Sequence, residues 1–199
     1  MIAVIDYKAG NLTSVMKALT ALGAAAKITD DPAMVRGAER VVLSGVGHFA
    51  ATGRLRETGI EDAVREVIAA GVPFLGICVG LQWLFEGSAE ADAVPGLGVI
   101  RGSCTRFPET HKVPHVGWNT IEPAPQSRLL AGVPRQSFFY YTHSYRAPLV
   151  EETVGVTEYA DAFSGAVERG NLFGVQFHPE KSGDAGLQVL RNFLTVPRC

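Results

Sequence analysis

The chain has 199 residues, of which 47% are hydrophobic and 19% charged, and its formal net charge is −2. This length favours a single domain over residues 1–199, and the charge balance, with no block of basic residues, argues against nucleic-acid binding. No apolar run is long enough to cross a bilayer, and the start "MIAVIDYKAGN" lacks the pattern of a signal peptide, so we expect no membrane association.

The cysteines are odd in number and show no metal-ligand spacing. They fit a reducing compartment better than a disulfide framework, so we expect a cytoplasmic protein. The three residues are Cys78, Cys104 and Cys199.

The first half of the chain alternates short apolar runs with helical patterns. This order indicates parallel strands joined by right-handed crossovers, and apolar runs without alternation suit strands that are covered on both faces. The first helix has Asn11 as a possible cap and ends at Gly23. The predicted strands are Ile2–Asp6, Arg40–Ser44 and residues 72–77, and the predicted helices are residues 11–23 and 59–71.

After about Ala93 the pattern changes to short strand candidates separated by glycine, proline and asparagine. They indicate an antiparallel or mixed extension of the same sheet, followed by a final helix at residues 185–194. We therefore predict one three-layer α/β domain with a mostly parallel central sheet. The strand candidates are residues 97–102, 104–107, 115–121, 138–145, 153–159, 163–170 and 172–177.

A cysteine follows the third strand, at the edge of a parallel sheet where ligands and chemistry usually collect. The sequence Gly76-Ile77-Cys78-Val79-Gly80 matches the nucleophile elbow G-x-S-x-G with sulfur in place of oxygen. The glycines allow a tight, strained turn. The start of the following helix favours a thiolate there, and the Val79 N–H is a candidate oxyanion donor. The alternative is that Cys78 is a small buried hydrophobic residue.

A nucleophilic cysteine needs a base, and His178 in "FGVQFHPEKS" is the candidate. A strand leads into it, and Glu180 follows two residues later, on the same side if the chain stays extended. One ring nitrogen of His178 can then exchange a proton with sulfur while Glu180 orients the other. A zinc site at His111 and His115 is the competing interpretation, but Pro114 disfavours a helix that would align them.

The blocks "GICVGLQ" and "GVQFHPEKS" resemble the class I, or triad, glutamine amidotransferases. More narrowly, "IDYKAGNLTSV", "LSGVGHF", "VPHVGWN" and "YYTHSY" resemble the glutaminase subunits of imidazole glycerol phosphate synthase, and the match runs from Ile2 to the final helix. Relatives that make guanylate, anthranilate, carbamoyl phosphate or pyridoxal phosphate share the first two blocks and lack the others. The resemblance implies a class I glutamine amidotransferase-like, flavodoxin-like domain.

The resemblance also implies glutamine hydrolysis to glutamate and ammonia, without a cofactor or metal. It makes Cys78 the nucleophile, His178 the general acid and base, and Glu180 its orienting partner. The implied substrate-binding residues are Gln82, which lies one helical turn after Cys78, Glu90 for the α-amino group, and His143, Ser144 and Tyr145 beside the α-carboxylate.

Gly45-Val46-Gly47 corresponds to the family's oxyanion strand, where Val46 N–H, flanked by Gly47, joins Val79 N–H as a donor. Ser44 stands where the family commonly has proline. Because two flanking glycines make peptide rotation sterically easy, our hypothesis is that Val46 N–H is misaligned until a partner docks. The alternative is an ordinary strand-to-helix turn.

A partner is implied because the family passes ammonia to a separate (β/α)₈-barrel cyclase. In that complex ammonia joins a phosphoribulosyl formimino ribotide to give imidazole glycerol phosphate and an aminoimidazole carboxamide ribotide. The implied interface residues are Asn11, Trp118, Tyr140 and Lys181. The alternative is a purely structural role: Asn11 as a helix cap, Trp118 and Tyr140 as core aromatic residues, and Lys181 as a solvated charge.

Three further interpretations remain open from the sequence. One is another triad amidotransferase, such as the pyridoxal phosphate glutaminase. Another is a cysteine peptidase of similar fold, although Gln82 and Glu90 suit a closed amino-acid pocket better than an extended peptide. The third is a binding module that has lost catalysis, which the presence of all three triad residues disfavours.

Overall fold

The protein is described by a computed structural model that covers residues 1–198, so Cys199 lies outside the described residues. A mixed sheet of eight strands in the order β2-β1-β3-β4-β13-β12-β11-β8 forms its centre. The parallel strands are β1 (Ile2–Ile5), β2 (Ala26–Thr29), β3 (Arg40–Gly45), β4 (Phe74–Cys78) and β13 (Leu172–Val175), and the antiparallel ones are β8 (Glu122–Pro123), β11 (Thr153–Tyr159) and β12 (Asp161–Arg169).

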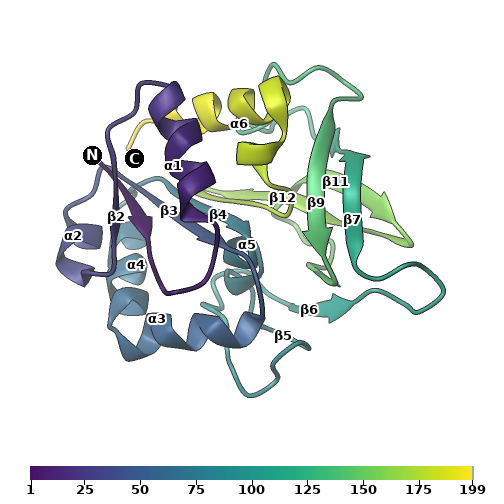
Figure 1. The fold of residues 1–199 in the computed structure, drawn as a ribbon, viewed down its shortest axis with the longest axis horizontal. Helices are drawn as coiled ribbons and strands as arrows, with labels where there is room; N and C mark the ends of the chain where they lie inside the picture. The colour runs from purple at the N-terminus through teal and green to yellow at the C-terminus, as the bar shows by residue number, and fades with distance from the viewer. Residues whose placement is uncertain (199) are drawn as a thin grey trace.

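Helices cover both faces of this sheet, which gives the predicted three layers (Figure 1). The helices α1 (Leu12–Ala21) and α6 (Gly183–Thr195) lie on one face, and α3 (Gly53–Glu57) and α4 (Ile60–Ala69) on the other. Because both faces are covered, every residue of β1, β4 and β13 is buried, as their continuous apolar runs predict. The Asn11 side chain accepts a hydrogen bond from the Ser14 N–H and caps α1.

The elements of the first half that were not predicted include β2 and three short helices, namely α2 (Pro32–Arg36), α3 and a 3₁₀ helix at Phe49–Thr52. The strand is four residues long with two exposed positions, so its apolar signal is weak. It nevertheless pairs with β1 at every residue and forms the edge of the sheet.

The strand prediction at residues 97–102 is wrong. The N–H groups of Val99 and Ile100 both donate to the Leu84 carbonyl, and that of Leu97 donates to the Trp83 carbonyl. The segment therefore wraps the end of α5 (Val79–Trp83) instead of joining a sheet. Its buried Leu97 and Ile100 pack into the core, which is why the sequence resembles a strand.

Several strands expected in the extension of the central sheet form two smaller sheets. β7 (His115–Thr120) and β9 (Phe138–His143) pair only with each other among the described residues. The second small sheet contains β5 (Gly87–Ser88), β6 (Ser103–Arg106) and β10 (Tyr145–Arg146). The extension is therefore correct for β11 and β12 and wrong for these strands, which stand beside the main sheet (Figure 1).

Candidate active site

The turn between β4 and α5 has the strained geometry of the predicted elbow. Cys78 sits there with φ +55° and ψ −109°, a region that residues with side chains rarely adopt. A Cβ on Gly76 would lie 2.6 Å from the carbonyl carbon of Gly80 and 2.8 Å from the nitrogen of Leu81. A Cβ on Gly80 would clash with the Leu43 carbonyl oxygen. Both glycines are therefore required, because they let α5 lie directly against β4 and β3.

The next parallel strand, β13, brings a histidine and a carboxylate to the same end of the sheet. Val175 pairs in register with Ile77, so the residues after each strand lie near each other. The His178 Nδ1 lies 2.9 Å from Oε1 of Glu180, and both side chains are almost fully buried. Their contact was predicted for an extended chain, but the 3₁₀ turn η2 (Pro179–Lys181) begins immediately after His178 and folds Glu180 back onto the ring.

Electrostatics link this histidine to the cysteine. Burial alone would lower the pKa of His178, but the Cys78 side chain and the Glu180 carboxylate outweigh it and raise that pKa to about 10. The other ring nitrogen, Nε2, is buried and has no aligned hydrogen-bond partner among the described residues. The structure thus brings Cys78, His178 and Glu180 together, with one nitrogen held by the carboxylate and the other available for proton transfer.

Gln176, which the sequence analysis did not identify, contacts the Cys78 sulfur. The Nε2 of Gln176 donates to Sγ of Cys78 at 3.6 Å, and its Oε1 accepts from Nε2 of Gln82 at 3.0 Å. The same Gln82 nitrogen donates to the Tyr145 carbonyl oxygen at 2.9 Å. Gln82 is buried behind the elbow with its amide nitrogen engaged. The available signal for Gln176 was its position two residues before His178, on the same side of an extended chain.

The predicted α-amino ligand lies beside the glycine loop at residues 45–48. One oxygen of Glu90, Oε2, accepts the Phe49 N–H at 2.7 Å. Phe49 begins the 3₁₀ helix η1 (Phe49–Thr52), which immediately follows the glycine loop at residues 45–48. Glu90 is half-buried, and it contacts the backbone three residues after Val46.

The glycine loop at residues 45–48 is tightly packed on one side and open on the other. The Tyr7 hydroxyl fills the space beside Gly45, and a Cβ on Gly10 would lie 2.8 Å from the Ser44 carbonyl oxygen. Val46 is 36% exposed and its N–H makes no backbone hydrogen bond within residues 1–198. Gly47, with φ +120°, adopts a conformation that suits glycine.

The segment His143-Ser144-Tyr145 enters the site mainly through its backbone. The two ring nitrogens of His143 are engaged, Nε2 with Nδ1 of His115 at 3.1 Å and Nδ1 with the Tyr145 carbonyl oxygen at 2.8 Å. Burial lowers the pKa of His143 to about 3 and that of His115 to about 4, so both rings are neutral at pH 7. Ser144 is half-buried and follows the strand that passes the Cys78 sulfur, whose Sγ lies 4.0 Å from the Thr142 carbonyl oxygen.

Three of the predicted interface residues form one cluster. Trp118 and Tyr140 are cross-strand partners in the β7–β9 sheet, with ring centroids 5.9 Å apart. The Lys181 Nζ lies 5.5 Å from the Tyr140 ring, which is itself 6.5 Å from the His178 ring. Asn11 is exposed at the start of α1 and follows Gly10, which packs against the Ser44 carbonyl oxygen.

The histidines proposed as zinc ligands are used otherwise. His115 pairs with His143 and stacks on Tyr159, while His111 is exposed. Within residues 1–198, no three His, Cys, Asp or Glu side chains are grouped as metal ligands. In the same residues, no helix has the length and apolar character that spanning a membrane requires.

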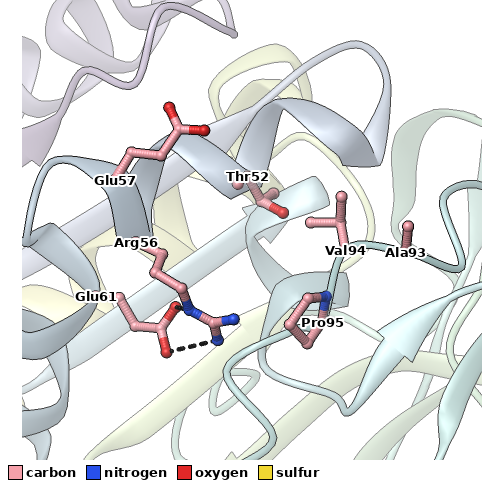
Figure 2. A pocket seen from close by; sticks show the side chains of 8 residues that line it. Thr52, Arg56, Glu57, Glu61, Ala93, Val94 and Pro95 are labelled. Atoms are coloured by element: carbon pink, nitrogen blue, oxygen red, sulfur yellow. Dashed lines mark hydrogen bonds and ion pairs between the residues drawn. The ribbon is translucent and has the colours of Figure 1, made fainter.

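A separate cavity of about 220 Å³ lies between α3, the start of α4 and residues 93–95 (Figure 2). Arg56 lines it but is bonded through two nitrogens to the Glu61 carboxylate, which Arg65 also contacts. This ion pair engages Arg56 and Glu61, whereas Glu57 lines the cavity without a hydrogen bond or ion pair among the described residues. None of the residues around Cys78 lines it.

Comparison with protein families gives one match over nearly the whole chain. The family model "Glutamine amidotransferase class-I" matches residues 3–196. Among curated proteins, the chain is 50% identical over 195 residues to the imidazole glycerol phosphate synthase subunit HisH of Moorella thermoacetica, covering 96% of this chain and 93% of that protein. It is 46% identical over 199 residues to the HisH subunit of Thermococcus kodakarensis, covering 97% and 98%.

Solved structures share the fold at low sequence identity. A glutamine amidotransferase crystal structure matches with a TM-score of 0.75 at 22% identity, covering 98% of this chain and 97% of the other. A chain from the PurLQS structure of Thermotoga maritima matches with a TM-score of 0.75 at 17% identity, covering 97% and 96%. These matches confirm the α/β architecture with a parallel core and an antiparallel extension.

Proposed function

Since the chain belongs to the class I glutamine amidotransferases, and within them to the HisH glutaminase subunits of imidazole glycerol phosphate synthase in histidine biosynthesis, we propose that its Cys78, His178 and Glu180 hydrolyse glutamine. The observation that carries this proposal is the meeting of a strained cysteine and a buried His–Glu pair at the ends of two adjacent parallel strands. A merely structural cysteine has no need of either feature.

The first half of the reaction uses the thiolate of Cys78 as nucleophile. It attacks the side-chain amide carbon of glutamine, and the carbonyl electron pair moves onto oxygen to form a tetrahedral oxyanion. When the oxyanion collapses, the C–N bond breaks and the His178 imidazolium gives its Nε2 proton to the departing nitrogen, releasing ammonia. The raised pKa of His178 supports this step, because the imidazolium is then the resting form at neutral pH.

The second half returns the enzyme to its starting state. Neutral His178 takes a proton from water, and the resulting hydroxide attacks the glutamyl thioester. The C–S bond breaks, glutamate leaves, and the thiolate–imidazolium pair forms again. Glu180, bonded to Nδ1 throughout, stabilises the imidazolium and fixes which nitrogen faces the sulfur.

Two backbone groups are proposed to stabilise the oxyanion. Val79 N–H comes from the first residue of α5, and Val46 N–H, next to Gly47, comes from the exposed glycine loop. The absence of a backbone hydrogen bond to Val46 within the described residues supports a peptide that can rotate into place. With the Val46 peptide misaligned, the resting enzyme has low activity, and docking of the loaded partner rotates the peptide into place.

Substrate binding is proposed to involve the residues around the elbow. Glu90 retains one carboxylate oxygen that is not used by Phe49, and this oxygen suits the α-amino group of glutamine. Ser144 and the backbone of Tyr145 are proposed to border the α-carboxylate. Gln82 and His143 have their polar nitrogens engaged inside the protein, so their proposed contribution is to shape this wall.

As a subunit of a synthase, the chain implies a partner subunit, and we propose the (β/α)₈-barrel cyclase of the HisF type in a heterodimer. The proposed docking surface on this chain is the outer face of the β7–β9 sheet, where four aromatic or aliphatic side chains share one side. The support is exposure of large apolar groups beside the triad. Val116, Trp118 and Phe138 are each more than half exposed, and Tyr140 lies among them next to His178.

We propose that residues 1–199 act as one amidotransferase domain, supported by a family match over residues 3–196. We also propose a cytoplasmic location, where a catalytic thiol stays reduced, supported by the free thiols of Cys78 and Cys104.

The experiment is to measure ammonia release from glutamine by the isolated chain and by its complex with the cyclase and the cyclase ligand. We expect release that rises strongly in the loaded complex. Cys78→Ala should abolish glutamine-driven synthesis while the complex still uses added ammonia. Equal rates for the isolated chain and the complex would refute the rotating Val46 peptide, and full activity of Cys78→Ala would refute the nucleophile.

A further inference from the structure

Gln176 occupies an unusual position for a polar side chain outside the proposed triad. It follows β13 directly, is fully buried, and its backbone N–H donates to the Gly165 carbonyl oxygen at 2.9 Å. Its side chain ends 3.6 Å from the Cys78 sulfur. A buried amide is costly to leave unpaired, so the contacts of both its ends define what this residue does.

The neighbouring glutamine determines which end of the Gln176 amide faces the sulfur. The Tyr145 carbonyl oxygen is purely an acceptor, so the Gln82 atom 2.9 Å away must be its NH₂ group. That NH₂ group makes a second hydrogen bond, 3.0 Å long, to the Gln176 amide, which must therefore present its oxygen. The Gln176 NH₂ group then points at the sulfur, and turning it over would break the bond to Gln82.

A donor in this position matters because a thiolate accepts hydrogen bonds and donates none. In a buried site its charge must be balanced by donors, and each donor is stronger there than in water. Among the described residues, the Gln176 amide is a side-chain donor that contacts the sulfur, and the nearby His178 imidazolium contributes a positive charge. A fixed N–H also restrains the rotation of the thiolate about its Cα–Cβ bond.

We propose that Gln176 is a positioning residue whose amide N–H stabilises and orients the Cys78 thiolate, and that Gln82 locks this amide in the donating orientation. The inference rests on the proposed function, because it gives both glutamines a part in preparing the same nucleophile. It also accounts for a glutamine one turn after Cys78 whose nitrogen is already engaged within the protein.

The test is the pH dependence of Cys78 alkylation by iodoacetamide, followed by mass spectrometry of the peptide that contains it, from about pH 5 to about pH 10. Gln176→Met has nearly the same volume and no N–H. It should move the midpoint upward by about one pH unit, since a hydrogen bond to a charged group is worth about tenfold or more. Gln82→Met should move it less. Gln188→Met, on α6 and bonded to Asn192, is the matched control and should not move it.

Each outcome decides one question. An unchanged midpoint in folded Gln176→Met overturns the inference, even if glutaminase activity falls, because space filling alone would explain that loss. If Gln176→Met does not fold, as judged by its thermal transition, Gln82→Met decides, and an unchanged midpoint there overturns the inference. Failure of the proposed function is separate and shows as glutaminase activity retained in Cys78→Ala.

Discussion

Adding one methyl group at Gly76 tests whether the elbow geometry is needed for catalysis. The new Cβ would lie 2.6 Å from the carbonyl carbon of Gly80 and 2.8 Å from the nitrogen of Leu81, both backbone atoms of α5. Ordinary contacts begin at about 3.4 Å, so α5 must move away from β4 by roughly 1 Å. Overpacking of this kind costs about 2 kcal/mol, which corresponds to a fall in melting temperature of about 4 to 8 °C.

The effect on the reaction should exceed the effect on folding. Cys78 joins β4 to α5, so a shift of about 1 Å at the helix displaces the sulfur from His178 and lowers kcat/KM about a hundredfold. The assay is glutamine-dependent ammonia release by the complex, with melting followed in parallel.

Gly174→Ala is the matched control for Gly76→Ala. Gly174 pairs with Gly76 across the two strands, but the nearest atoms to its Cβ would be side-chain carbons, with methyl groups of Leu81 and Val167 at 3.0 Å. These methyl groups can move, so we expect a change in kcat/KM of less than about tenfold. If Gly76→Ala kept the wild-type rate, or if both variants lost activity equally, the reasoning about the elbow would be refuted.

Three further predictions concern the triad, the interface and acid stability. The Cys78 side chain and the Glu180 carboxylate together raise the pKa of His178 to about 10, and Glu180→Gln removes the charge of the second group. Because the imidazolium is lost as pH rises through that pKa, the alkaline limb of the kcat/KM profile should move down by about one unit. Trp118→Ala should weaken cyclase binding in calorimetry by about 2 kcal/mol, with little change in the melting temperature of the free chain, whereas the similarly exposed Leu149→Ala should not weaken it. Burial lowers the pKa of His143 from 6.5 to about 3, so the free energy of unfolding in urea should be retained above pH 6.5 and fall as pH drops toward 3. The non-titrating variant His143→Gln should show a shallower fall. If the free energies of wild type and variant fell in parallel with pH, a neutral buried ring would be contradicted.

The central sheet and the elbow were predictable because their signals are local. The apolar runs of β1, β3 and β4 need no partner to be recognised, and the spacing of Gly76, Cys78 and Gly80 describes a steric requirement within one turn. The contact between His178 and Glu180 was likewise predicted from their separation of two residues, although a 3₁₀ turn rather than an extended chain brings them together.

What the sequence did not reveal depends on distant contacts. The short runs at β7 and β9 predict strands but not that they pair apart from the main sheet. Leu97 and Ile100 look like strand residues, yet their backbone groups bond the end of α5. The role of Gln176 needs a sulfur 98 residues away in the chain, and the orientation of its amide needs Gln82. No periodic pattern in the sequence indicates either contact.

In the proposed reaction, the Cys78 sulfur becomes covalently bonded to the substrate with the assistance of His178. The direct measurement is acid-quenched turnover of glutamine by the loaded complex, with mass spectrometry of the Cys78 peptide. We expect a glutamyl group on Cys78 that accumulates early, is absent in Cys78→Ala, and is strongly reduced in His178→Ala. Turnover at the normal rate in which Cys78 never gains a glutamyl group, or the same adduct on another residue, would contradict it.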